Sequence, residues 1–454
     1  MSSAPLHVLV IGAGFGGLTL AHGLRKNGVS VAVYEKQRSR TEGLYGYRVG
    51  IDPTGNRALK DCLPPQLFDT FLATCARTPL YFNVLTEKKK RTAAVPLRGD
   101  ADLINSERSV SRQTLRQLLL TGLEDIVHFD KQFTHYEQHP DGTVTAHFAD
   151  GTHATGDALI AADGAHSAVR AQYLPHAHLK PAGITTIGAK IPMTPEALAL
   201  LPRESQQGLS LVFAPKGFMC IWHVMEFRWD ERGGIKDTAA GNDADLLRAW
   251  PGLLFDNTRD YISFGIWASD DKFPADVMQL RGQALLDLTL KLTPNWHPDF
   301  RKLFAMADPT TPFPLRIATS EPVPAWKTTN ITLLGDAIHT MTPGQGVGAN
   351  TSLRDAMLLT HALTDAHHHT QPLLTALAQY EAEMIPYGFA RVKDSLAENG
   401  TNGDDPLHKP VIGRAVLAGA RAYFKAIDKI PSMQRKFLDD LYTYRGAEEG
   451  PTTK

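Results

Sequence analysis

The chain has 454 residues, of which 43% are hydrophobic and 21% are charged, as expected for a globular protein with two or three domains. Its 47 Lys and Arg residues balance 48 Asp and Glu residues, so no net charge would attract nucleic acid or a membrane surface. The three cysteines form no CxxC pair, which argues against a disulfide framework and a cysteine zinc site and fits the reducing cytoplasm. No apolar run has the length of a membrane span, so a soluble protein is expected.

The chain begins with the pattern of a βαβ unit. Residues 6–11 form a short apolar run typical of a buried parallel strand. A glycine-rich turn and a helical pattern follow, and residues 29–35 form a second strand rich in β-branched side chains. Further along, residues 111–123 predict an amphipathic helix, and the alternation over 143–148 predicts a small antiparallel sheet. Residues 157–162 are expected to form another buried strand.

The pattern changes after about residue 175, where strand-like segments alternate with loops. These segments lie at residues 184–191, 209–213, 218–227 and 261–267. Residues 308–326 are rich in Pro and Thr and are predicted to connect back to the first domain. A buried strand over 331–334 follows, and the chain is predicted to be helical from residue 350 to near its C-terminus.

A glycine motif lies between the first strand and the first helix. Gly12, Gly14 and Gly17 form a G-x-G-x-x-G pattern: the first permits a tight turn, the second lets a pyrophosphate approach the backbone, and the third allows close packing of helix and strand. The helix N-terminus offers free N–H groups to phosphates. Glu35 ends the second strand, where an acid can accept a ribose hydroxyl. The unit predicts a dinucleotide site but does not distinguish FAD from NAD.

Two later segments narrow the cofactor. Residues 158–170 form a strand that ends in Asp-Gly, and residues 332–356 form a strand, an acid, a glycine loop and a helix. These segments resemble the DG and GD motifs of the group A flavoprotein monooxygenases, the para-hydroxybenzoate hydroxylase-like family. Residues 111–115 also resemble the segment of that family that carries an FAD-contacting arginine. The resemblance implies an α/β fold with a Rossmann-like FAD-binding domain, a mixed β-sheet substrate domain and C-terminal helices.

The predicted FAD-binding domain is built from separated pieces of sequence. The predicted segments are the first part of the FAD-binding domain with inserted sheet segments (1–174), the substrate-binding sheet domain (175–320), the second part of the FAD-binding domain (321–400) and a C-terminal helical segment (401–454).

The resemblance also implies roles for individual residues. Asp336 would accept hydrogen bonds from the ribityl hydroxyls, and Arg112 would lie near the pyrophosphate or ribityl chain. Asp163 would organise the cofactor region, although an Asp-Gly before a helix is also a common N-cap. Backbone N–H groups before the last long helix would face the flavin pyrimidine edge, which gains negative charge on reduction. The residues expected to bind the cofactor are Gly12, Gly14, Gly17, Glu35, Arg48, Val49, Arg112, Asp163, Asp336, Pro343, Gly346, Gly348, Ala349 and Asn350.

The reaction that the resemblance implies has two halves. NADH or NADPH would bind transiently, because only one nucleotide-binding βαβ unit is visible, and would reduce the flavin. O2 would then add at the flavin C4a to give a peroxide that transfers one oxygen to a small substrate, aromatic or a secondary metabolite. Hydroxylation, epoxidation and Baeyer–Villiger insertion all stay open, as do the choice of nicotinamide and the oligomeric state. No side chain is assigned as a catalytic nucleophile, and no metal is expected.

Aromatic side chains of the middle segments are either core residues or candidates for the substrate pocket. They are Trp222, His223, Phe264 and Trp267. Two polar runs are assigned to structure. Residues 88–91 are expected at a solvated hairpin tip, and the histidines at 367–369 diverge around a helix and cannot easily share one ion.

Two other functions are compatible with the first glycine motif. A flavin-dependent halogenase would share the FAD domain, but its W-x-W-x-I-P segment is absent. A non-catalytic binding protein on the same fold would keep the glycine motif without using flavin. Retention of Asp336 and the glycine loop after it argues against that alternative.

Overall fold

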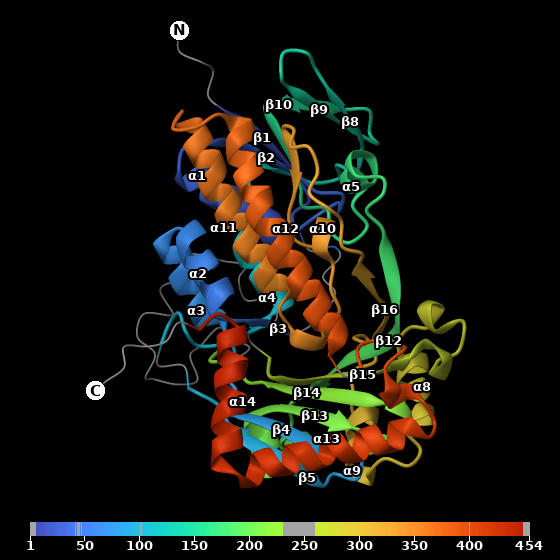
Figure 1. Ribbon diagram of the computed structural model, residues 1–454. Helices are drawn as coiled ribbons and strands as arrows, with labels where there is room; N and C mark the ends of the chain where they lie inside the picture. Colours follow the sequence, from blue (N-terminus) through green and yellow to red (C-terminus); the bar gives the residue numbers. More distant parts are fainter. Residues whose placement is uncertain are drawn as a thin grey trace.

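The computed structural model describes residues 6–40, 42, 46, 48–99, 102–229, 259–398 and 400–447, which build two domains around two large sheets (Figure 1). The first domain contains a five-stranded parallel sheet in the order β17-β11-β1-β2-β7. Its strands are β1 (His7–Ile11), β2 (Ser30–Tyr34), β7 (Val127–His128), β11 (Ala158–Ala161) and β17 (Ile331–Leu333). The sheet therefore joins pieces of sequence from both halves of the chain.

Helix α1 (Phe15–Lys26) connects β1 to β2 and completes the predicted βαβ unit. Its buried face packs against α11 (Gly348–His367), which also contacts α2 (Pro53–Cys62) and α12 (Leu373–Ala397). The helices α1 and α11 can approach closely because Gly23 has no side chain. A Cβ atom there would lie only 2.4 Å from Thr360 Oγ1. These helices bury the apolar strands of the parallel sheet in one continuous core.

The second domain contains a seven-stranded sheet in the order β16-β12-β15-β14-β13-β4-β5. The sheet is mixed, because β13 pairs with β4 in parallel and the other pairs are antiparallel. Its strands are β4 (Tyr81–Thr86), β5 (Arg91–Pro96), β12 (Leu179–Pro192), β13 (Gly208–Phe213), β14 (Met219–Met225), β15 (Tyr261–Ser269) and β16 (Phe313–Ser320). Two of these strands, β4 and β5, come from the predicted first segment and pair next to β13.

Helices cover both faces of this sheet (Figure 1). Helices α8 (Gln283–Leu292) and α9 (Pro298–Ala305) lie against one face and form an apolar core with it. Helix α13 (Ile412–Lys429) packs on the other face at the β4–β5 side, and α14 (Pro431–Tyr444) follows it. The end of α14 reaches the first domain, so the C-terminal helices touch both domains.

The remaining strands and α-helices are short. They are β3 (Arg48–Ile51) paired with β6 (Arg108–Ser111), the antiparallel strands β8 (Phe133–Gln138), β9 (Val144–Phe148) and β10 (His153–Gly156), and the helices α3 (Pro65–Thr74), α4 (Arg112–Leu120), α5 (Ala168–Tyr173), α6 (Pro195–Ala199) and α10 (Asp336–His339). The α/β class, the mixed second sheet and the C-terminal helices are confirmed.

The predicted connection over residues 308–326 contains a strand that the sequence pattern did not indicate. Phe313–Ser320 form β16 and pair with β12 before the chain returns to the parallel sheet at β17. This strand lies at the edge of the sheet. A proline such as Pro314 is tolerated in an edge strand, because one side of such a strand pairs with no neighbour. Among the helices that the structure describes, none is long and apolar enough to cross a membrane.

Candidate functional site

The glycine motif forms a tight turn between β1 and α1. Gly12 has φ +109°, and a Cβ atom there would lie 2.4 Å from the carbonyl oxygen of Ala162. A Cβ atom at Gly17 would lie 2.3 Å from the Gly12 carbonyl oxygen, so this glycine permits close packing of helix and strand. At Gly14, by contrast, the nearest atom to such a Cβ is 4.0 Å away. The turn is therefore closed on its inner side and open where a phosphate would approach.

Glu35 lies directly beside this turn. Its carboxylate is buried and accepts a hydrogen bond from the Ala13 N–H at 2.8 Å. Arg116 of α4 also reaches the turn, with its Nε donating to the Ala13 carbonyl at 3.2 Å and its Nη2 3.8 Å from Glu35 Oε2. Arg116 was not among the predicted residues, because it follows Arg112 on a helix and only the packing of α4 brings it to the turn.

Arg112 and Asp336 come from distant segments but lie near each other. Arg112 is the first residue of α4, and its guanidinium lies 5.0 Å from the centre of the Phe15 ring. Its side chain is exposed, and the charge of Asp336 is close enough to act on it. Asp336 itself begins α10 and is exposed between buried neighbours, so its carboxylate is available to a ligand.

Asp163 lies before α5 but is not its N-cap residue, which is Ser167. The Oδ2 of Asp163 accepts hydrogen bonds from the N–H groups of Ala168 and Val169 in the first turn of that helix, at 2.8 and 3.3 Å. Its Oδ1 is buried and has no hydrogen-bond partner among the described residues, and burial raises the pKa of Asp163. Arg170 then ties this segment to the next, because its Nη1 donates to the Ala337 carbonyl at 2.8 Å.

A buried ion pair holds the turn that presents Asp336. His339 Nε2 lies 2.6 Å from Asp355 Oδ2, and the same oxygen accepts a hydrogen bond from the Gly335 N–H at 2.9 Å. Burial alone would lower the pKa of His339, but the charge and hydrogen bond of Asp355 outweigh it and raise that pKa. Both residues stand inside the predicted motif without a predicted role, and their pairing follows from the docking of α10 on α11.

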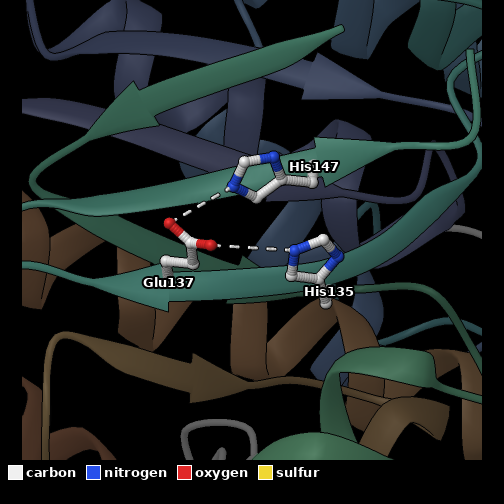
Figure 2. Close-up of side chains that lie close together, drawn as sticks. All are labelled: His135, Glu137 and His147. Carbon is white, nitrogen blue, oxygen red and sulfur yellow. Dashed lines mark ion pairs between the residues drawn. The ribbon is translucent and has the colours of Figure 1, made fainter. Parts of the chain in front are cut away.

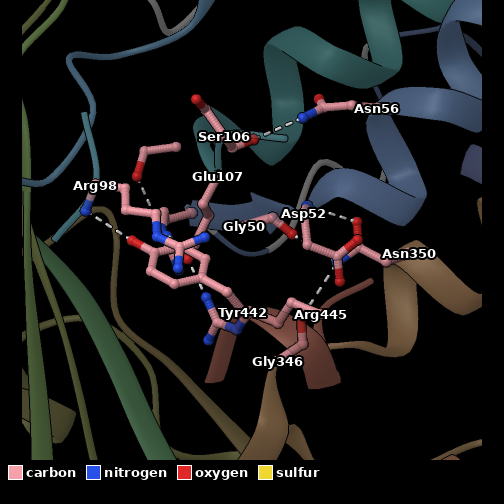
Figure 3. Close-up of polar contacts among 12 residues, drawn as sticks. Gly50, Asp52, Asn56, Arg98, Ser106, Glu107, Gly346, Asn350, Tyr442 and Arg445 are labelled. Carbon is pink, nitrogen blue, oxygen red and sulfur yellow. Dashed lines mark hydrogen bonds and ion pairs between the residues drawn. The ribbon is translucent and has the colours of Figure 1, made fainter. Parts of the chain in front are cut away.

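The loop before α11 has unoccupied space next to its backbone at Gly346. Gly346 has φ +66°, and no atom lies within 4 Å of the position that a Cβ would occupy there. Helix α11 then starts at Gly348, and Asn350 in its first turn anchors β3. Asn350 Nδ2 donates to the Gly50 carbonyl at 2.9 Å, and its Oδ1 accepts from the Asp52 N–H at 3.0 Å (Figure 3). The helix N-terminus and β3 therefore form two sides of one site.

Arg48 on β3 is paired at the boundary between the domains. Its Nη2 donates to Glu107 Oε1 at 2.6 Å. The other carboxylate oxygen of Glu107 accepts from Arg445, which follows α14 (Figure 3). Burial would raise the pKa of Glu107, but the two arginines outweigh it and hold that pKa below its usual range. We call Arg48, Glu107 and Arg445 the arginine cluster. Val49, the neighbour of Arg48, packs against the first core.

The four candidate substrate residues do not gather in one place. Trp222 and Phe264 face α9, where Trp222 stacks on Phe304 with ring centroids 5.1 Å apart, so both belong to the core of the second domain. His223 lies on the opposite face of β14, near Arg48 and Arg445. Burial and these two charges hold the pKa of His223 well below its usual range, and its Nε2 has no hydrogen-bond partner among the described residues.

Trp267 shares the face of His223 but lies further along the sheet. Its Nε1 donates to the Gly400 carbonyl at 3.1 Å, next to the end of α12. The two polar runs also have clear positions. Residues 88–90 form the turn between β4 and β5, with Lys89 paired to Asp299 at 2.6 Å, and His367 ends α11.

The residues fit a flavin dinucleotide better than a nicotinamide alone. The structure offers an open glycine turn with a buried acid, and a second set of groups at the far end of the same sheet edge. That second set is the exposed Asp336, the unpartnered Oδ1 of Asp163 and the open backbone at Gly346. A long ligand with phosphates at one end and a polyol and ring at the other would use both sets.

Comparison with known proteins gives matches over most of the chain. A model of an FAD binding domain matches residues 310–394, and a model of an NAD(P)-binding Rossmann-like domain matches residues 10–49. A solved candidate FAD-containing monooxygenase from Photorhabdus luminescens is 31% identical with a TM-score of 0.73, and the match covers 86% of this chain and 96% of that one. A structure from Klebsiella pneumoniae with FAD and uric acid has the same fold, with a TM-score of 0.63 at 22% identity.

Two curated relatives add to these matches. A dual O-methyltransferase/FAD-dependent monooxygenase from Cercospora beticola is 32% identical over 399 residues, which is 83% of this chain but 44% of the relative. The FAD-dependent urate hydroxylase of Klebsiella pneumoniae is 28% identical over 83% of this chain and 85% of its own length. The chain thus spans less than half the length of the dual-function relative.

Proposed function

Because the chain belongs to the family of FAD-dependent monooxygenases, we propose that it inserts one oxygen atom from O2 into a small aromatic or secondary-metabolite substrate, with NADH or NADPH as reductant. The expected resemblance to this family is confirmed, and the protein is an FAD-dependent enzyme. The observation that carries the proposal is the convergence of Arg112, Asp163 and Asp336 on one edge of the parallel sheet, at the open glycine turn.

Relatives with named substrates support an aromatic compound. The similar proteins include the urate hydroxylase and a 6-methylsalicylate 1-monooxygenase from Aspergillus terreus, which is 26% identical over 396 residues. The arginine cluster adds a chemical preference. Two guanidinium groups share one carboxylate there, so the cluster carries a net positive charge beside the neutral imidazole of His223. An ionised oxygen on the substrate, such as a phenolate or carboxylate, would complement it.

Each part of the site has a task in this reaction. Bound FAD supplies the oxidation of the nicotinamide and the activation of oxygen. Asp336 accepts hydrogen bonds from ligand hydroxyls. The His339–Asp355 pair fixes the turn at Gly335 that presents Asp336. The N-terminus of α11 stabilises negative charge that develops nearby. His223 and the arginine cluster orient the substrate and exclude water from that side of the sheet.

An absorbance spectrum of the purified protein tests the proposal first. Oxidised-flavin bands that bleach on addition of NADH or NADPH in air, and faster with one compound of a phenol and salicylate panel, are the expected result. Mass spectrometry should then find one labelled oxygen in the product when the gas is isotopically labelled O2. A colourless protein that cannot be reconstituted with FAD would overturn the proposal. A halogenated product that requires chloride would replace it with the halogenase alternative.

A further inference from the structure

The small antiparallel sheet of β8, β9 and β10 carries a row of histidines on its solvent face. His135 on β8 pairs directly with His147 on β9, and their rings stack with centroids 4.4 Å apart and an interplanar angle of 2°. Glu137 lies two residues after His135, so its side chain is on the same face. Its two carboxylate oxygens point at the two rings (Figure 2), 4.0 Å from His135 Nε2 and 3.7 Å from His147 Nε2.

A neighbouring hydroxyl contacts the His135 ring on the side away from Glu137. The Thr134 hydroxyl oxygen lies 3.0 Å from the His147 carbonyl oxygen and 3.1 Å from His135 Nδ1. When the hydroxyl donates to the carbonyl, it accepts a hydrogen bond from Nδ1, and His135 Nε2 then presents a lone pair to Glu137. A hydrogen bond from Nδ1 to an acceptor is also how proteins orient a histidine that binds a metal through Nε2.

The His147 ring also has a nitrogen near Glu137 that forms no hydrogen bond. This atom, Nε2, is buried and has no hydrogen-bond partner among the described residues. This nitrogen lies 3.7 Å from Glu137 Oε2, and the two rings stack with their centroids 4.4 Å apart. A single cation between the three groups would accept a lone pair from each of them at once.

We propose that His135, Glu137 and His147 bind a divalent transition-metal ion such as Zn2+, a site separate from and independent of the monooxygenase site. Their ligand atoms all lie within 4.8 Å of one another. Metal–ligand bonds of about 2.0–2.2 Å require only small rotations, which partly exposed side chains can make. Two imidazoles and a carboxylate favour Zn2+, Ni2+ or Cu2+ over Mg2+ or Ca2+, which prefer oxygen ligands alone. Water would complete the coordination, and the ion would tie β8 to β9.

Titration of the untagged flavoprotein with Zn2+ by calorimetry, and with Co2+ by visible absorbance, tests the site. One equivalent should bind, and Co2+ should give the absorbance of a site with nitrogen ligands. His135→Asn and His147→Asn should each abolish that binding. Thr134→Val should weaken it about tenfold, because the valine keeps the shape of the threonine but removes the acceptor that holds the ring.

Two control variants separate this site from other histidines. His153 on β10 faces His147 at a ring distance of 5.9 Å but is not one of the three ligands, so His153→Asn should leave the affinity within about twofold of the native value. A variant with Asn at His367, His368 and His369 should also bind normally. Equal Zn2+ affinity in the native protein and in His135→Asn and His147→Asn, with flavin content unchanged, would overturn the proposal. So would loss of binding only in the His367–His369 variant.

Discussion

Replacing Glu107 with Gln should destabilise the folded protein because this carboxylate serves two arginines at the boundary between the domains. Arg48 and Glu107 have side chains that are 12% exposed, and Arg445 is 20% exposed, so water cannot readily replace the lost partner. A glutamine keeps one acceptor oxygen and can satisfy one arginine. Its amide group then points N–H donors at the other guanidinium, which is left buried and unpaired.

The size of the effect follows from this geometry. Hydrogen bonds to charged groups contribute about 1.5–3 kcal/mol each, and removal of one partner from a buried ion pair costs about 3–5 kcal/mol. Since Glu107→Gln leaves one arginine without an acceptor and the other with an uncharged one, we expect a loss of about 3 kcal/mol in the free energy of unfolding at neutral pH. The pKa of Glu107 is lowered in the folded protein, so the loss should shrink as pH falls through the acidic range below the ordinary glutamate pKa.

Urea unfolding of the flavoprotein, followed by tryptophan fluorescence, measures this loss. Glu383→Gln is the matched control: it makes the same chemical change in a pair with Arg354 at 2.9 Å, but Glu383 is 55% exposed, so the expected loss is about 0–1 kcal/mol. In Arg445→Met, the additional Glu107→Gln change should cost less than it does alone. Equal stability losses in the Glu107→Gln and Glu383→Gln proteins would refute the reasoning.

Four further predictions concern the site itself. Asp336→Ala should lower flavin affinity, measured as the FAD content of the purified protein, and a variant that stays fully yellow would contradict the role of this carboxylate. Gly12→Ala should give little folded flavoprotein on expression and size-exclusion analysis, because its Cβ would lie 2.4 Å from the Ala162 carbonyl oxygen at φ +109°. His223→Phe should raise KM for a phenolic or carboxylated substrate while FAD content stays unchanged; an equal effect on uncharged substrates would argue against the proposed contact. Burial raises the pKa of Asp52 to about 7, so the native protein should lose stability relative to Asp52→Asn as pH rises through about 7, and a flat difference between pH values on either side would contradict this.

The sequence by itself predicted the parts of this protein that depend on local backbone rules. Gly12, Gly17 and Glu35 could be placed because a strand, a tight turn and a helix follow one another within one short unit. The later segment with Asp336 was identified through its resemblance to the GD motif of the group A flavoprotein monooxygenases, and its strand, acid, glycine loop and helix follow in that order. These motifs led to the family and the cofactor.

Only the tertiary structure decided which side chains meet across long separations in sequence. Trp222 and His223 are neighbours on one strand, yet one packs on α9 and the other faces the arginine cluster, because successive side chains of a strand point to opposite faces. Arg445 lies 338 positions from the Glu107 that it contacts, and no local pattern marks such a pair. His135 and His147 form a possible ligand pair only through the register of β8 and β9, which a bulge in β8 shifts by one residue. Contacts of this kind depend on packing and register, and those are properties of the whole fold.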